Sequence, residues 1–146
     1  MSKQQQEQAN AEIVKSWVFQ DLKARDLTLD EWRSLVLWSA PEQGRFSTLT
    51  LTLAYAELVR QEFLGRCLGL DDVAALGVCR VKGLFQEEVF SGKRLFLWRS
   101  LARDPEDALI VPTLSLLNGV LTTIWCWVED PDQLLYGFDR TPLLPA

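Results

Sequence analysis

The sequence predicts an α+β fold in which about four N-terminal helices pack on one face of a C-terminal antiparallel β-meander of about four strands. Two observations support this prediction. Apolar residues recur at helical spacing in the first half of the chain, and runs rich in Val, Phe, Leu and Trp, separated by turn dipeptides, fill the second half. Helical and strand patterns that segregate along a chain are typical of α+β proteins.

A single domain over residues 1–146 is expected, because this length is typical of one domain. Hydrophobic residues make up 48% of the chain and charged residues 24%, as in globular proteins. The Gln-rich lead, residues 1–9, is expected to be disordered. The tail, residues 133–146, contains two prolines and is expected to lie over the domain without regular structure.

The first predicted helix follows Asn10, whose side chain can accept a free amide hydrogen at a helix start. Its apolar residues fall at helical spacing up to Leu22. The second predicted helix begins at Leu29, because Thr28 and Glu31 have the spacing of a capping box. We expect this helix to end near Ser39, ahead of Pro41.

A third helix is predicted from Ser47 or Thr48 toward Leu68. Its opening alternates Thr and Leu like a strand, but residues 54–65 are strong helix formers and favour a helix.

A short fourth helix is predicted over residues 72–76. Gly69 is expected to end the preceding helix, Asp71 to cap the new one and Gly77 to terminate it.

Two hairpins are predicted in the second half. The first joins residues 80–90 to residues 93–101 through Ser91-Gly92, in a register that places Phe85 opposite Trp98. The second joins residues 108–117 to residues 120–129 through Asn118-Gly119, a dipeptide suited to a type I′ turn.

Pro112 complicates the second hairpin. Proline cannot donate to a central ladder, so it implies an edge strand or a bulge. A buried helix that starts at Pro112 and runs through residues 112–129 is the alternative.

The chain contains no His, which excludes Ser-His-Asp and Cys-His nucleophilic sites and zinc sites with His ligands. It also contains no GxGxxG, GxxxxGK[ST] or GxSxG motif. Acidic pairs such as Asp71-Asp72 and Glu87-Glu88 are interpreted as helix ends and strand faces. We therefore expect no catalytic residue, no cofactor and no metal.

Three cysteines, at positions 67, 79 and 126, form no CxxC pair. Buried thiols in a reducing cytoplasm are the expected state. The chain start lacks an apolar signal region, and no apolar run is long enough to cross a bilayer, so we expect a soluble cytoplasmic protein.

The charge is unevenly placed, and the chain has six Trp. Residues 80–103 hold six basic and two acidic residues, whereas residues 104–146 hold one basic and seven acidic residues. Trp125 and Trp127 share a strand face with Leu121, and this face is either a second core layer or a surface that a partner covers. The candidate partner-binding residues are Leu121, Trp125, Trp127, Arg94, Arg99 and Trp98.

These features favour a non-enzymatic protein-binding module: an adaptor, an inhibitor, an immunity-type protein or a chaperone. The predicted partner is another protein, and a second copy of this chain, in a homodimer, is one form of such a partner. A carboxylate- or metal-dependent enzyme is the first alternative. The second is a single-stranded nucleic-acid binder that uses the basic and aromatic hairpin over residues 80–103, although an isoelectric point of about 4.8 argues against nucleic acid.

Overall fold

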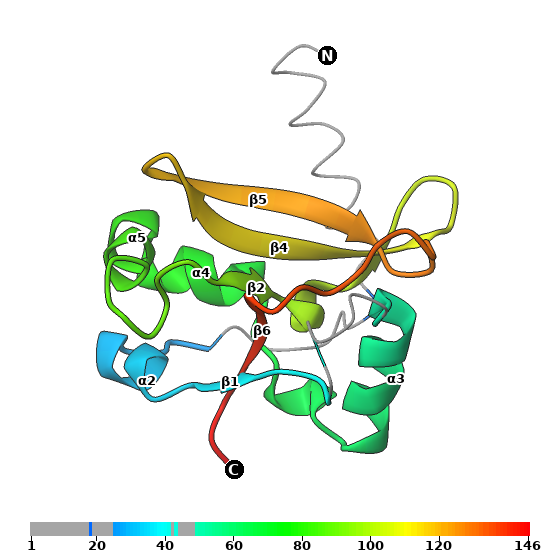
Figure 1. Ribbon diagram of the computed structural model, residues 1–146. Coiled ribbons are helices and arrows are strands. Elements are labelled where there is room, and N and C mark those ends of the chain that lie inside the picture. Colours follow the sequence, from blue (N-terminus) through cyan, green and yellow to red (C-terminus); the bar gives the residue numbers. More distant parts are fainter. Residues whose placement is uncertain (1–17, 19–24, 42, 44–48) are drawn as a thin grey trace.

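The computed structural model describes residue 18, residues 25–41, residue 43 and residues 49–146. In this part of the chain a sheet of six strands is flanked by four helices and two 3-10 turns (Figure 1). The strands are β1 (Val36–Trp38), β2 (Arg94–Phe96), β3 (Ala102–Arg103), β4 (Leu109–Leu117), β5 (Val120–Trp127) and β6 (Asp139–Leu143). The helices are α2 (Leu29–Arg33), α3 (Leu51–Arg60), α4 (Leu70–Leu76) and α5 (Val78–Leu84), and the turns are η1 (Leu64–Arg66) and η2 (Trp98–Ser100).

The predicted α+β class is confirmed, but the sheet is mixed and has six strands, whereas we expected an antiparallel meander of about four. Strand β4 lies at its centre. Along one side β4 pairs with β5, and along the other it pairs first with β3 and then with β2. Strand β6 runs parallel to β2 and antiparallel to β1.

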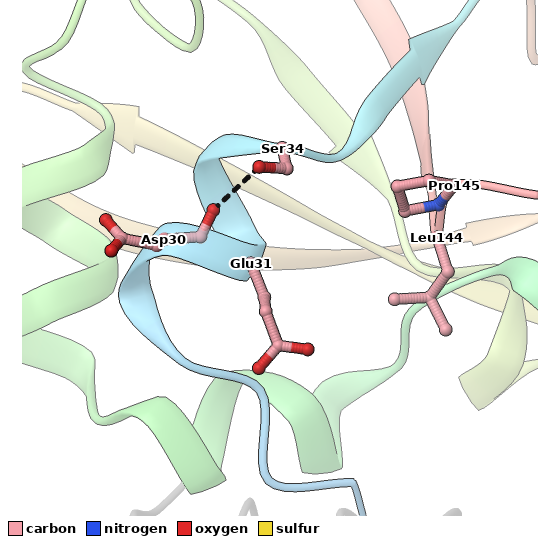
Figure 2. A pocket seen from close by; sticks show the side chains of 5 residues that line it. All are labelled: Asp30, Glu31, Ser34, Leu144 and Pro145. Carbon is pink, nitrogen blue, oxygen red and sulfur yellow. Dashed lines mark hydrogen bonds between the residues drawn. The ribbon is translucent and has the colours of Figure 1, made fainter.

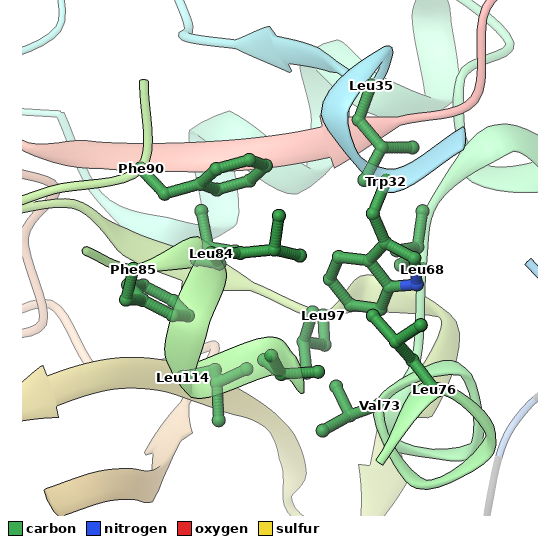
Figure 3. Packing of buried hydrophobic residues seen from close by; sticks show 12 residues of the cluster. Trp32, Leu35, Leu68, Val73, Leu76, Leu84, Phe85, Phe90, Leu97 and Leu114 are labelled. Carbon is green, nitrogen blue, oxygen red and sulfur yellow. The ribbon is translucent and has the colours of Figure 1, made fainter. Parts of the chain in front are cut away.

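Two apolar clusters lie on opposite faces of this sheet. Leu95 and Leu114, which are cross-strand partners, belong to a cluster with residues of α2, α4 and α5. Figure 3 shows Trp32 of α2 packed in this cluster beside Leu68 and Leu76. The other face contributes residues such as Val111 to a cluster with α3. The helices therefore cover both faces of the sheet, whereas we expected one.

The second predicted hairpin is confirmed as β4 and β5. Asn118 and Gly119 both have positive φ, at 50° and 77°, as a type I′ turn requires. Pro112 lies in a central strand, not at an edge. Its carbonyl accepts a hydrogen bond from the N–H of Leu97 at 3.0 Å. The N and C=O of one strand residue point to the same side, so the nitrogen of Pro112 also faces the side of β4 that carries β2 and β3. It lies in the gap between these two strands. The missing N–H thus falls where no ladder bond is needed.

The first predicted hairpin is wrong. Residues 78–84 form α5, and β2 pairs with β4 and β6. Three buried residues, Val81, Leu84 and Phe85, have the i, i+3, i+4 spacing of one helix face. This helical spacing competed with strand propensity, and burial against the first cluster decided the outcome.

Three further segments differ from the prediction. The third helix, predicted to run toward Leu68, ends at Arg60 and is followed by η1. The helix that begins at Leu29 ends at Arg33, because the following residues pair as β1 with β6. The tail over residues 133–146 is not irregular, since it contains β6. The pairing of β1 with β6 has no local signal in the sequence, because the two strands are about a hundred residues apart.

The predicted caps are partly confirmed. Thr28 and Glu31 form the capping box of α2, with hydrogen bonds of 3.1 Å and 3.0 Å. Thr50 caps α3, whereas the predicted caps Ser47 and Thr48 lie outside the described residues, as do the lead over residues 1–9 and most of the predicted first helix.

At α4 the cap assignment is corrected. Gly69 occupies the N-cap position, not the end of the previous helix, and the carboxylate of Asp72 accepts its N–H at 2.8 Å. Asp71, the predicted cap, lies within the first turn. Gly77 ends the helix as predicted, with φ of 100°.

Candidate functional site

The outer edge of β5 is the candidate site. The N–H of Val128 donates to the carbonyl of Leu109 at 2.9 Å, so these residues form a hydrogen-bonded pair. This pair fixes which residues of β5 form hydrogen bonds with β4 and which do not. Peptide groups of alternate residues in a strand point to opposite sides, so every second residue of β5 directs its N–H and C=O away from β4. These outward residues are Leu121, Thr123, Trp125 and Trp127. Among the described strands, β4 is the only one that pairs with β5.

This edge lacks the features that usually prevent strand pairing. Its eight residues contain no charge and no proline, although edge strands in monomeric proteins are commonly blunted by both. Val120, Ile124 and Trp127 are 63%, 46% and 52% exposed, so apolar surface lies on both faces of the strand. Figure 1 shows β5 along the margin of the described structure, with β4 between it and the other strands.

The first face of β5 holds the three predicted residues Leu121, Trp125 and Trp127. Leu121 is half-buried against the first apolar cluster, and Trp125 is also half-buried. Trp127 is exposed, and its indole Nε1 donates to Oδ2 of Asp104 at 3.2 Å. The face is therefore core at the hairpin turn and open surface at Trp127.

The carboxylate of Asp104 organises the loop beside Trp127. Backbone hydrogen bonds from Ala108, the indole of Trp127 and a bond from Glu106 hold the pKa of Asp104 below its usual value. The acceptor of the Trp127 indole is therefore a charged carboxylate at neutral pH, and a charged acceptor strengthens the hydrogen bond.

The second face of β5 borders a surface pocket of about 360 Å³. Leu116, Leu117, Ile124 and Phe138 supply apolar walls, and the polar lining includes Lys93, Arg94 and Ser115. Ser115 is only 8% exposed. The pocket adds a partly polar recess to the apolar surface around Ile124.

Arg94, another predicted contact residue, lines this pocket, and its guanidinium is engaged in contacts that hold the fold together. Its guanidinium forms two hydrogen bonds with Asp139, at 2.7 Å and 2.9 Å, and the Asp139 side chain is almost fully buried. Phe96, Tyr136 and Phe138 surround the guanidinium, with ring centroids 5.0, 6.0 and 5.7 Å from its central carbon. Arg94 therefore joins β2 to β6, and its contribution to a partner surface is limited to the exposed part of the side chain.

Trp98 and Arg99 lie elsewhere, in η2, and Trp98 belongs to the apolar cluster that includes α3. Trp98 is 1% exposed, and its indole donates to the hydroxyl of Thr141 at 3.2 Å. Arg99 is 7% exposed and lies 3.8 Å from the carboxylate of Asp71. The structure does not place these two residues on the β5 surface.

The basic and aromatic stretch over residues 80–103 does not form a stacking platform. The aromatic side chains that would stack on bases are between 1% and 3% exposed: Phe85, Phe90, Phe96 and Trp98. Burial in the two apolar clusters removes their faces from any ligand.

A second pocket, of about 240 Å³, brings together two carboxylates, which was the arrangement expected of an enzyme. Asp30, Glu31 and Ser34 line it with Leu144 and Pro145. Figure 2 shows the Asp30 and Glu31 carboxylates directed apart. Asp30 is paired with Arg33 at 3.1 Å, and Glu31 accepts the N–H of Thr28 in the capping box. Both carboxylates therefore form contacts within α2 and its N-terminal cap.

Groups of three potential metal ligands are absent from the described ranges. All three cysteines are free. Cys67 and Cys126 are buried as predicted, but Cys79 is exposed on α5, so the expectation of three buried thiols is wrong for this residue.

Charge is segregated toward the two ends of β5. The loops at its C-terminal end hold six carboxylates, at Asp104, Glu106, Asp107, Glu129, Asp130 and Asp132. Arg103 of β3 adjoins the first of these loops. At the turn end, Arg80 and Lys82 are exposed on α5, and Lys93 lines the pocket beside Leu117. Two carboxylates lie nearby in sequence: Glu88 is exposed, and Glu87 is paired with Arg33. Figure 1 shows α5 under the turn end of the hairpin.

Sequence reasoning identified Leu121, Trp125 and Trp127 but missed Val120 and Ile124. Strand alternation places these two on the opposite face from the Trp pair, where a core was expected. Their exposure depends on which elements cover that face, and no local sequence pattern gives this information. Sequence reasoning also missed that, among the described strands, β5 pairs with β4 alone, because strand order is a property of the tertiary structure.

Similarity to known proteins is absent: no protein family matches the chain, and neither a curated protein nor a solved structure is significantly similar to it. Among the described helices, the longest has ten residues, and none is long and apolar enough to cross a membrane.

Proposed function

We propose that this protein is a non-enzymatic protein-binding module, of the adaptor, inhibitor, immunity or chaperone type, and that it binds its partner along the outer edge of β5. The observation that supports the proposal is the combination of four outward-facing peptide groups with exposed apolar side chains on an uncharged strand. An extended partner strand would satisfy these peptide groups by β-augmentation.

Trp127 supplies the aromatic anchor of this proposed surface. Half of the side chain is exposed, and the bond with Asp104 limits its rotation, so little side-chain entropy is lost on binding. Exposed aromatic residues of this kind are frequent hot spots of protein interfaces. Leu121 and Trp125 form the adjoining part of the same face.

The proposal places the protein in the cytoplasm. Its support is that all three cysteines are free, including the exposed Cys79, which suits a reducing compartment.

The test uses Thr123→Pro. This substitution removes one outward N–H, while the N–H groups that bond with β4 are retained, so the fold should persist. Thr123→Val is the matched control, because it keeps the outward N–H and removes only the hydroxyl. Each variant is used to capture proteins from extracts of the source cells.

A partner of the proposed kind is retained by the wild type and by Thr123→Val, and lost with Thr123→Pro. In the purified complex it should also slow hydrogen exchange at the outward amides of Leu121 and Trp125. A captured set that is the same for all three proteins would reject the β5 edge as the binding site.

A further inference from the structure

We infer that the partner strand at this edge is β5 of a second copy, paired antiparallel about a two-fold axis at Ile124. The inference rests on the proposed function, because it names the occupant of the same edge. It is argued from the register of β5, the side chains that this register brings together and the charges at the two ends of the strand.

Register is the first argument. In an antiparallel pair, outward residues must face outward residues for their peptide groups to bond. A two-fold axis at Ile124 places Leu121 opposite the partner's Trp127 and Thr123 opposite the partner's Trp125, so all four outward residues of each copy are paired. With an axis at Thr123, Trp127 would face Gly119, which lies in the turn before β5. With an axis at Trp125, Leu121 would face Glu129, which lies beyond the end of β5.

Side-chain matching is the second argument. On one face, each Trp127 meets an aliphatic Leu121, a type of cross-strand pair that stabilises sheets. On the other face, Ile124 meets the partner's Ile124 across the axis, and its surface, 46% exposed, becomes covered. No like charges face each other along the strand, because β5 has none.

Charge is the third argument. Antiparallel pairing brings the acidic loops beside Trp127 toward the partner's basic turn end, where Arg80, Lys82 and Lys93 lie. The complementary ends of the two copies therefore approach at both ends of the joined strands. A parallel arrangement would instead place acidic loops beside acidic loops, at a cost that falls as salt screens it.

The experiment is disulfide trapping in a Cys79→Ser background, which removes the exposed native thiol. In the inferred register, residue 124 is a non-bonded pair on the axis, where Cβ atoms approach closely enough for a disulfide. Ile124→Cys should therefore form a disulfide-linked dimer roughly tenfold faster than the matched control Thr123→Cys, whose pair lies off the axis. Light scattering should give the mass of a dimer for the Cys79→Ser protein and of a monomer for Cys79→Ser with Thr123→Pro.

A monomer at all concentrations, or preferential trapping through Thr123→Cys, would overturn the inferred self-pairing. The proposed function is judged separately. If the chain is monomeric but captures another protein that Thr123→Pro releases, β5 is a binding edge for a different partner. If neither self-pairing nor such a partner is found, both proposals fail.

Discussion

At the scale of single residues, the structure separates side chains that look alike in the sequence. The three cysteines differ in burial and therefore in chemistry. Burial raises the pKa of Cys67 to about 12 and raises that of Cys126 above its usual value, whereas Cys79 is exposed on α5. Only the thiolate reacts readily with alkylating reagents.

We predict that Cys79 alone is alkylated in the native protein at pH 8. Cys67 should stay unmodified even at pH 9, because its pKa is about 12 in the folded state. Mass spectrometry of peptides from the native and the urea-unfolded protein checks this, and all three should react after unfolding. Native labelling of Cys67 at a rate similar to Cys79 would contradict the burial assigned to it.

A second residue-scale prediction concerns Asp72. Its carboxylate accepts hydrogen bonds from Arg25 at 3.2 and 2.7 Å and from the N–H of Gly69, and the side chain is fully buried. Asp72→Ala should lower the free energy of unfolding by about 3 kcal/mol, since it leaves the Arg25 guanidinium without its counter-charge. Asp30→Ala, at a carboxylate that is 93% exposed, is the control and should cost much less. Urea denaturation of both variants measures the difference.

At the scale of elements, the junction between α4 and η2 depends on a glycine for space. A Cβ at Gly69 would lie 2.7 Å from Oγ of Ser100 and 3.2 Å from Cβ of Arg99. The hydroxyl of Ser100 cannot move freely, because it accepts the N–H of Leu70 at 2.7 Å. Close approach of the two elements, not a special backbone angle, requires glycine here.

We predict that Gly69→Ala destabilises the protein by about 1–3 kcal/mol through this overpacking. Gly83→Ala is the matched control inside α5, where a Cβ meets no atom within 4 Å. It should stabilise the protein by roughly 0.5–1 kcal/mol, because alanine has the higher helix propensity. The two thermal midpoints should therefore shift in opposite directions. Equal shifts would show that the contact with Ser100 does not limit packing.

Elements with local signals could be predicted, and elements defined by distant pairing could not. The capping-box residues Thr28 and Glu31 correctly predicted the start of α2, and Asn118-Gly119 correctly predicted the turn between β4 and β5. Strands β1 and β6 pair across about a hundred residues, and the Trp32, Leu35, Val36 spacing looks helical until that pairing is known. Of the candidate site, the Trp face was predictable from alternation, but the open edge depended on strand order.

At the scale of the whole molecule, the position of a tryptophan in the fold decides what it contributes. Trp98 is enclosed between Tyr55 and Phe96, with ring centroids 5.5 and 6.0 Å away. Trp127 lies at the surface beside Asp104. Trp98 therefore belongs to the stability of the fold and Trp127 to the surface that we propose for binding.

We predict that Trp98→Ala lowers the free energy of unfolding by about 3–5 kcal/mol, which approaches the total stability of an ordinary domain. Trp127→Ala should lower it by about 1 kcal/mol or less while weakening association at the β5 edge. Thermal melting followed by light scattering on each variant separates the two effects. A Trp127→Ala variant that fails to fold would show that this residue is structural.

Pro112 also protects the sheet from slipping. A shift of β4 by two residues would keep its apolar residues on the same faces, so burial alone does not forbid it. In one direction the shift would bring Pro112 opposite Leu95, and in the other opposite Ala102. Either position requires an N–H that proline lacks, so a backbone carbonyl would be buried without a donor, at about 1–3 kcal/mol. The proline thus selects one alignment of β4 with β2 and β3, and this alignment determines where the hairpin of β4 and β5 lies along those two strands.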